Sequence, residues 1–174
     1  MDKVKRLKVA PELDTPSDLP NEASSAMAAA LNEIVADTFV LFVKTKNFHW
    51  HVSGPHFRDY HLMLDEQAQQ IFATIDELAE RVRKIGGTTL RSISHIAKLT
   101  MLPENNEDFV KPQAMMEELI ADHKKIVANM RRAHKLADRN DDVATASLLE
   151  TFIDGAERRL WFLFETSRAS RGED

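Results

Sequence analysis

The chain has no cysteine, few glycines and prolines, and no long uncharged apolar run. Its 174 residues include only 5 glycines and 6 prolines. Without cysteine, disulfides, thiolate zinc sites, iron–sulfur clusters and cysteine nucleophiles are excluded, so any metal must be held by histidine, aspartate or glutamate. Because no run of about 18 uncharged apolar residues occurs, we expect no membrane span. Because residues 1–10 lack the apolar block of a secretion signal, we expect a cytoplasmic protein.

Acidic residues outnumber basic ones, 28 to 23, and the formal net charge is −5 at pH 7. This balance argues against a body that binds nucleic acid through a general basic surface. Basic residues nevertheless gather at the N-terminus: Lys3, Lys5, Arg6 and Lys8. Three prolines follow before residue 22 and interrupt regular structure. We interpret residues 1–21 as a flexible basic tail, which is either a DNA-binding arm or a solvated terminus without a partner.

The spacing of apolar residues predicts an all-α protein. Long stretches carry apolar side chains with a period of about 3.6 residues, as amphipathic helices do. The expected helices cover residues 22–50, 56–84 and 112–137, and a fourth opens after Asp142. Gly54 and Pro55 end the first, and Pro112 suits the first turn of the third. Residues 22–168 therefore form one predicted helical domain, and residues 169–174 form a short C-terminal tail.

The connection between the second and third helices is unusually long. It covers residues 86–111 and contains a short amphipathic stretch at 90–99. A helix of about 27 residues is roughly 40 Å long, and a connection of this length can run the full height of a bundle. Four long helices with one long crossover form the ferritin-like four-helix bundle. A plain up-and-down bundle with an ordered loop is the alternative.

Ferritin-like bundles often hold two irons inside one subunit through Glu-x-x-His motifs. This sequence contains no such motif, and its periodic interior positions carry mainly Phe, Leu, Ile and Met. We therefore expect no di-iron centre within one subunit. The remaining histidines have no carboxylate partner evident from spacing: His56 starts a helix, His95 lies in the crossover, and His123 and His134 are polar positions on the third helix.

The second predicted helix carries potential metal ligands at mirrored positions. His61, Asp65, Asp76 and Glu80 share one helix face. The first pair lies about 20 Å along the axis from the second, too far apart for one metal ion. Position numbers 61 and 80 have the same midpoint as 65 and 76. If this helix packs antiparallel against a copy of itself, two identical clusters result, each built from both chains.

Acids on a helix face are usually solvated, and this remains the simpler interpretation of the pattern. The stretch His49-Trp50-His51 at the end of the first helix favours a metal site, because one imidazole there can join the cluster. Carboxylates with one or two imidazoles suit Fe(II), Mn(II) or Zn(II).

Several segments together resemble the Dps family, the DNA-binding proteins from starved bacterial cells. They are residues 47–51 (NFHWH), 54–55 (GP), 61–65 (HLMLD), 75–81 (IDELAER) and 160–162 (LWF). The resemblance implies a bacterial, cytoplasmic homododecamer of ferritin-like subunits that oxidises Fe(II), preferably with hydrogen peroxide, and stores the iron. It also implies the ligands of the intersubunit ferroxidase centre: His49, His61 and Asp65 from one chain and Asp76 and Glu80 from its two-fold partner, with Trp50 beside the metal.

The resemblance implies two further features. Family members admit iron through acidic pores, and the candidates here are Asp141, Asp142, Glu150 and Asp154. Some members bind DNA through basic tails, for which Lys3, Lys5, Arg6 and Lys8 are the candidates, and this implies association with the nucleoid and protection of DNA under oxidative stress. The alternative function is a structural nucleoid protein that compacts DNA with little ferroxidase activity.

Overall fold

The computed structural model describes residues 9–168, and in this part of the chain every regular element is a helix. The prediction of an all-α protein is therefore confirmed. In chain order the elements are η1 (Pro11–Leu13), α1 (Asn21–His51), α2 (Phe57–Lys84), α3 (Ile93–Leu99), α4 (Pro112–Asp138) and α5 (Val143–Arg168). The four long helices match the ranges expected from the apolar period.

The helix ends follow from local backbone chemistry. Gly54 and Gly86 adopt positive φ values of 110° and 84°, which glycine reaches without strain, in the turns after α1 and α2. Ser92 caps α3, because its side chain accepts a hydrogen bond from the backbone N–H of His95 at 3.2 Å. Pro112 occupies the first turn of α4.

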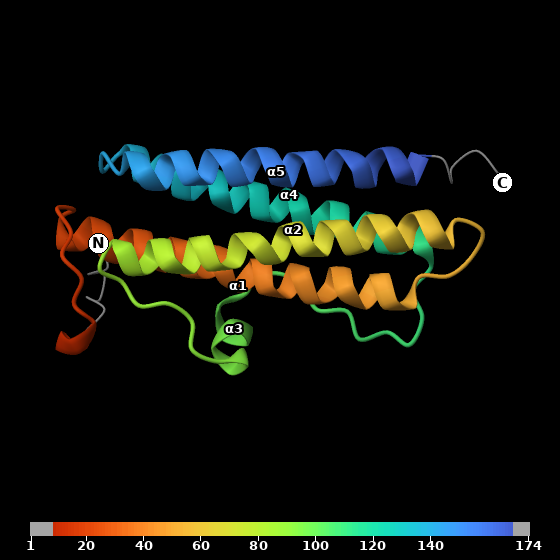
Figure 1. Cartoon of the computed structure of the whole chain (residues 1–174), viewed down its shortest axis with the longest axis horizontal. Helices are drawn as coiled ribbons and strands as arrows, with labels where there is room; N and C mark the ends of the chain where they lie inside the picture. Colours follow the sequence, from red (N-terminus) through yellow and green to blue (C-terminus); the bar gives the residue numbers. More distant parts are fainter. Residues whose placement is uncertain (1–8, 169–174) are drawn as a thin grey trace.

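The long helices lie side by side, and the crossover runs along the bundle (Figure 1). α1 and α2 are antiparallel, as are α4 and α5, whereas α2 and α4 run in the same direction. The chain therefore leaves α2 at one end and enters α4 at the other. This is the ferritin-like arrangement, and the up-and-down alternative is wrong.

A buried carboxylate fixes the crossover to the bundle. Asp37 of α1 is fully buried, and its Oδ1 accepts hydrogen bonds from the backbone N–H groups of Met101 at 2.6 Å and Leu102 at 3.3 Å. Its Oδ2 accepts from Asn129 of α4 at 3.0 Å. One side chain thus joins α1, the crossover and α4.

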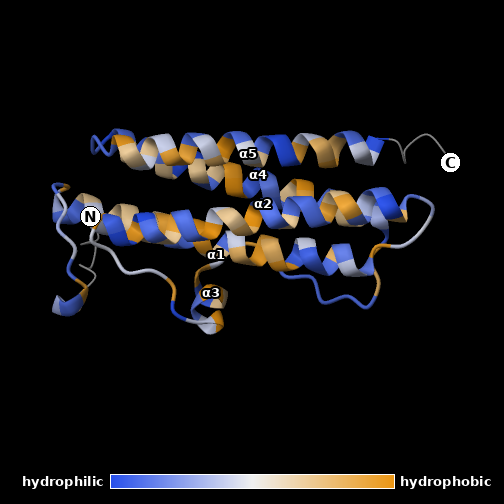
Figure 2. Ribbon diagram, in the orientation of Figure 1, coloured by the Kyte–Doolittle hydropathy of each residue, from blue (hydrophilic) through white to orange (hydrophobic). Residues whose placement is uncertain are grey.

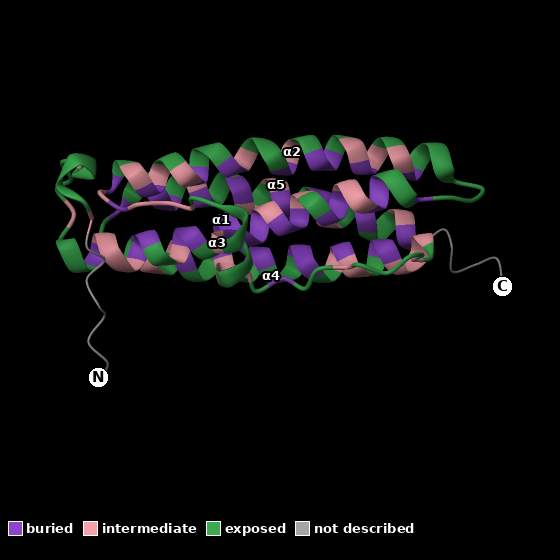
Figure 3. Ribbon diagram, turned by 90° about the horizontal axis from the view of Figure 1, so that it is seen from below, coloured by how far each residue is buried: buried purple, intermediate pink, exposed green. Residues whose placement is uncertain are grey.

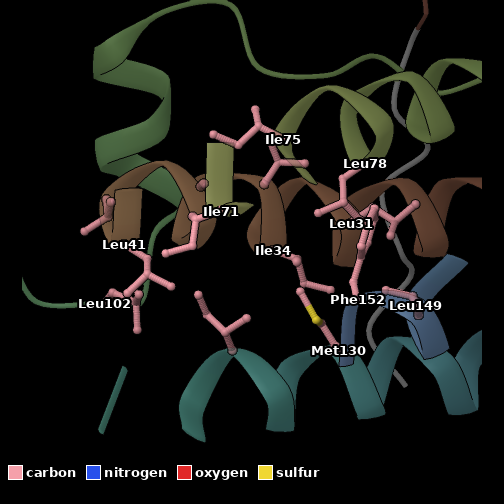
Figure 4. Packing of buried hydrophobic residues seen from close by; sticks show 14 of the residues in the cluster. Leu31, Ile34, Leu41, Ile71, Ile75, Leu78, Leu102, Met130, Leu149 and Phe152 are labelled. Atoms are coloured by element: carbon pink, nitrogen blue, oxygen red, sulfur yellow. The ribbon is translucent and has the colours of Figure 1, made fainter. Parts of the chain in front are cut away.

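Apolar side chains from all four long helices form one core. Leu31 and Ile34 of α1 meet Leu78 of α2, Met130 of α4 and Phe152 of α5 (Figure 4). Apolar and polar residues are interspersed along each long helix (Figure 2), as amphipathic packing requires. α1 is long and apolar enough to cross a membrane, but most of its apolar stretch is buried in the bundle, which accounts for its composition.

The interior also contains charges, contrary to the expectation of a purely apolar lining. Lys44 of α1 and Asp122 of α4 are both buried and form an ion pair of 2.7 Å. Burial raises the pKa of Asp122, and the hydrogen bond from Lys44 opposes that shift. The period did not reveal this pair because a long lysine stem packs like an apolar side chain.

The segment before α1 contacts the end of α2. The guanidinium of Arg83 donates hydrogen bonds to the carbonyl of Leu13 at 2.7 Å and to Oγ1 of Thr15 at 3.2 Å. The predicted DNA-binding residues, Lys3, Lys5, Arg6 and Lys8, lie outside the described residues.

Candidate metal centre

The turn between α1 and α2 brings His49 and His61 into contact. Their imidazole rings stack with centroids 3.8 Å apart and an angle of 24° between planes. Nδ1 of His49 lies 2.8 Å from the carbonyl oxygen of His61, and Nδ1 of His61 lies 2.9 Å from that of His49. The two residues therefore join the end of α1 to the start of α2 by a reciprocal pair of hydrogen bonds.

These bonds set the tautomer of both rings. A carbonyl oxygen only accepts, so each Nδ1 carries the proton. In a neutral imidazole the other nitrogen, Nε2, then keeps its lone pair, which is the form that binds a metal. A backbone carbonyl bound to the distal ring nitrogen is also the usual way in which proteins orient a ligating histidine.

Asp65 follows one helical turn after His61 and faces the same place. Its Oδ1 lies 3.9 Å from Nε2 of His49 and 2.8 Å from Nζ of Lys46. Oδ2 accepts a hydrogen bond from Gln69 at 3.0 Å. The hydrogen bond from Lys46 is the main cause that lowers the pKa of Asp65, so this carboxylate is an anion ready to accept a cation.

Trp50 lies on the open side of this group. Its side chain is 62% exposed, and the ammonium of Lys46 lies 5.7 Å from the centre of its ring. This distance permits a cation–π interaction. Lys46 thus has two neighbours, the carboxylate of Asp65 and the face of the indole, whereas sequence reasoning did not identify Lys46 at all.

The other two predicted ligands lie elsewhere on the subunit. Asp76 and Glu80 are exposed near the far end of α2, and Glu80 pairs with Lys84 at 2.9 Å. Within residues 9–168, no three histidine, aspartate or glutamate side chains are grouped closely enough to hold a metal ion. One subunit therefore brings together His49, His61 and Asp65 and leaves the second pair about 20 Å away along the helix.

The outward edge of α2 between these two groups is exposed (Figure 3). It includes two large apolar side chains, Leu62, 49% exposed, and Phe72, 56% exposed. Phe72 also contacts Phe42 of α1, with ring centroids 5.0 Å apart. Exposed apolar residues on a helix face are characteristic of a surface that is covered in an assembly.

The four pore candidates differ in their environments. Asp142 is buried, caps α5 by accepting from the backbone N–H of Thr145 at 3.0 Å, and forms an ion pair with Arg81. Its carboxylate is therefore already neutralised. Asp141, with φ of 54°, Glu150 and Asp154 are exposed.

Two of the remaining histidines differ from the expectation. His134 lies between two carboxylates, with Nδ1 3.1 Å from Asp138 and Nε2 2.9 Å from Glu150. His123 is completely buried, and it contacts Arg159 of α5. Asp138 is one turn after His134 and was recognisable from spacing, whereas the partners on α5 are 16 and 36 positions away.

Comparison with known proteins places this arrangement in a family. The ferritin-like domain model matches residues 28–168. The DNA protection during starvation protein of Brevibacillus brevis is 34% identical over 79% of this chain and 91% of the relative. The chain belongs to the Dps family. The prediction made from the motifs is thus confirmed.

Solved Dps structures have the same fold. DpsC from Streptomyces coelicolor superposes with a TM-score of 0.84 at 28% identity, over 87% of this chain and 89% of that one. Dps from Vibrio cholerae, described as a member of a broad superfamily of ferritin-like diiron-carboxylate proteins, superposes with a TM-score of 0.81 at 26% identity. The match covers 84% of this Dps chain and 92% of the Vibrio cholerae protein.

Proposed function

We propose that two copies of this Dps chain pair antiparallel through α2 and form two centres that oxidise Fe(II), preferably with hydrogen peroxide. The observation that carries this proposal is the incomplete ligand set of one subunit. His49, His61 and Asp65 converge, and the mirrored pair Asp76 and Glu80 stands where a two-fold copy would bring it to them.

Each ligand has a role that follows from its chemistry. Asp65 and Glu80 are hard anionic donors, which favour Fe(III) over Fe(II) and so make oxidation more favourable. His49 and His61 bind as neutral imidazoles through Nε2, since their Nδ1 protons are held by backbone carbonyls. Asp76 acts as a direct ligand or orients a neighbouring one.

The overall reaction balances with hydrogen peroxide as the oxidant. Two Fe(II) ions each lose one electron, and one peroxide accepts both electrons and two protons as its O–O bond breaks to give two waters. Peroxide and Fe(II) are consumed together, which removes the two reagents that generate hydroxyl radicals. The protein therefore protects DNA from oxidative damage without needing to touch it.

The assembled protein is proposed to be a cytoplasmic dodecameric shell that stores the ferric product. Asp141, Glu150 and Asp154 remain as exposed acids that can attract Fe(II) at its entrances. Through the basic residues Lys3, Lys5, Arg6 and Lys8, many copies of the tail would bind DNA weakly, additively and without sequence preference. A mobility-shift assay at low ionic strength tests this, and free DNA at saturating protein contradicts it.

The test of the catalytic proposal is anaerobic loading of iron-free protein with Fe(II), followed by peroxide. We expect rapid appearance of ferric absorbance in the wild type and its loss in His61→Ala and in Glu80→Gln. Glu77→Gln is the matched control, because Glu77 is also exposed on α2 but lies about 100° round the helix from the ligand positions. Wild-type rates in Glu80→Gln would contradict the proposal and favour a structural nucleoid protein.

A further inference from the structure

A second group of polar side chains lies between α2 and α5, away from the metal centre. Arg159 of α5 is 7% exposed and has no carboxylate partner within residues 9–168. Its Nε donates a long hydrogen bond of 3.4 Å to Nε2 of His123. Burial lowers the pKa of His123 to about 4 and that of Arg159 to about 10, so the first is neutral and the second charged at neutral pH. A buried cation without an anion is costly.

Gln67 of α2 adds an unsatisfied acceptor beside this cation. Its Nε2 donates to the backbone carbonyl of Arg159 at 3.3 Å, which fixes the orientation of the amide. Its Oε1 is buried and has no hydrogen-bond partner. Gln67 is only 4% exposed, so bulk water does not compensate.

A small hollow of about 20 Å³ joins these groups, and Glu66, Gln70, Arg158 and Phe162 also line it. This volume holds roughly one water-sized group. The guanidinium of Arg158, which has no ion-pair partner within residues 9–168, lies 5.7 Å from the centre of the Phe162 ring. The hollow therefore presents two guanidinium groups and one unpaired amide oxygen.

We propose that this hollow binds a protonated oxyanion of the phosphate class, with its anionic oxygens on Arg158 and Arg159 and its O–H on Oε1 of Gln67. The ligand must both accept from guanidinium groups and donate to an amide oxygen. Monohydrogen and dihydrogen phosphate do both, whereas sulfate at neutral pH has no proton to donate. The carboxylate of Glu66, which accepts from Gln70 at 2.9 Å, also disfavours a more highly charged anion.

The site stays open when α2 pairs with its copy. At 100° per residue, positions 66, 67 and 70 lie roughly 100° or more round the helix from position 65, on the face proposed for pairing. The binding site is therefore separate from the two-fold surface. It also needs no iron, so its success or failure is independent of the proposed function.

The test is isothermal titration of iron-free protein with inorganic phosphate and, separately, with sulfate. We expect phosphate to bind at least about tenfold more tightly than sulfate, since an unmet acceptor costs that much or more. Gln67→Leu should abolish this preference, and Arg159→Lys, which keeps the charge but loses the fork, should weaken phosphate binding. Arg168→Gln, at an exposed arginine paired with Glu165, is the control and should bind like the wild type.

Folding of each variant is checked by circular dichroism and by its mass in solution. Equal affinities for the two anions in the wild type, unchanged by Gln67→Leu, would overturn the proposal and leave the hollow to a bound water. Absence of phosphate binding at millimolar concentration would overturn it equally. A phosphorus NMR signal that broadens with the wild type and not with Arg159→Lys would support it independently.

Discussion

His49 and His61 hold each other by their backbones as well as by their rings. Each Nδ1 binds the carbonyl oxygen of the other residue, at 2.8 and 2.9 Å, while the rings stack at 3.8 Å. A change at either residue therefore frees a carbonyl and a ring of its partner. Both free nitrogens belong to one subunit, so the acids that complete the centre must come from a second one.

Sharing of the centre between subunits predicts that two inactive variants restore activity together. Asp65→Asn damages one half of each centre and Asp76→Asn damages the other. In a mixed pair, one of the two centres carries both changes and the other carries neither. After random reassembly of an equal mixture, about a quarter of all centres should be intact.

The measurement is the initial rate of peroxide-driven Fe(II) oxidation after denaturation and joint refolding. Each variant refolded alone is the control and should stay inactive. A mixed sample that contains hybrid assemblies by mass spectrometry, yet shows no more activity than either parent, would contradict a shared centre.

Lys46 predicts a competition at Asp65. Its ammonium lies 2.8 Å from Oδ1, the oxygen nearest to His49, so an incoming divalent cation must displace it. Lys46→Met should therefore raise the affinity for Fe(II) or Co(II) several-fold, because it removes a like charge from the site. Anaerobic Co(II) titration followed by visible absorbance measures this, with Lys124→Gln on α4 as the control. Unchanged or weaker binding would show that Lys46 does not occupy the metal position.

The glycines predict opposite effects of the same substitution. Gly155 lies inside α5, where an added Cβ would meet only Nη1 of Arg159 at 3.5 Å, an ordinary contact. Gly155→Ala should therefore stabilise the fold by roughly 0.5–1 kcal/mol, since alanine suits a helix better. At Gly87 a Cβ would lie 2.6 Å from that of Ala28, so Gly87→Ala should destabilise it. Urea unfolding of both variants tests this contrast, and a loss of stability in Gly155→Ala would contradict it.

The fold was predictable because its signals are local. The apolar period and the breaks at Gly54 and Pro112 lie in consecutive residues, and they placed the long helices close to their observed ranges. The start of α3 was less clear, since Ser92 acts as a cap only through the conformation of its neighbours. The stacking of His49 on His61 was not deducible either, because it depends on the turn between two helices.

The buried polar groups show where sequence patterns fail. Lys44, Asp122 and His123 occupy positions that face the interior, and their partners lie on other helices far along the chain. A period analysis assigns polar residues to the surface, so it misplaced His123. Asp142 was expected at a pore, but Arg81, 61 positions earlier, takes up its charge.

His123 predicts how stability depends on pH. Its pKa falls from 6.5 to about 4 in the folded protein, mainly because the imidazole is completely buried and secondly because Arg159 is near. As the pH falls below about 6.5, the unfolded chain takes up a proton that the folded chain refuses. The stabilisation is therefore complete above pH 6.5 and is lost as the pH falls to about 4, by up to about 3 kcal/mol.

Other groups titrate in the same range, so the informative quantity is a difference. His123→Gln keeps an acceptor for Nε of Arg159 but cannot be protonated there. The melting temperature of the wild type minus that of this variant should fall as the pH is lowered from 7 to 4, because only the wild type carries the cost of a neutral buried histidine. Two melting curves that shift in parallel over this range would mean that His123 gains its proton as readily in the folded protein as in the unfolded chain.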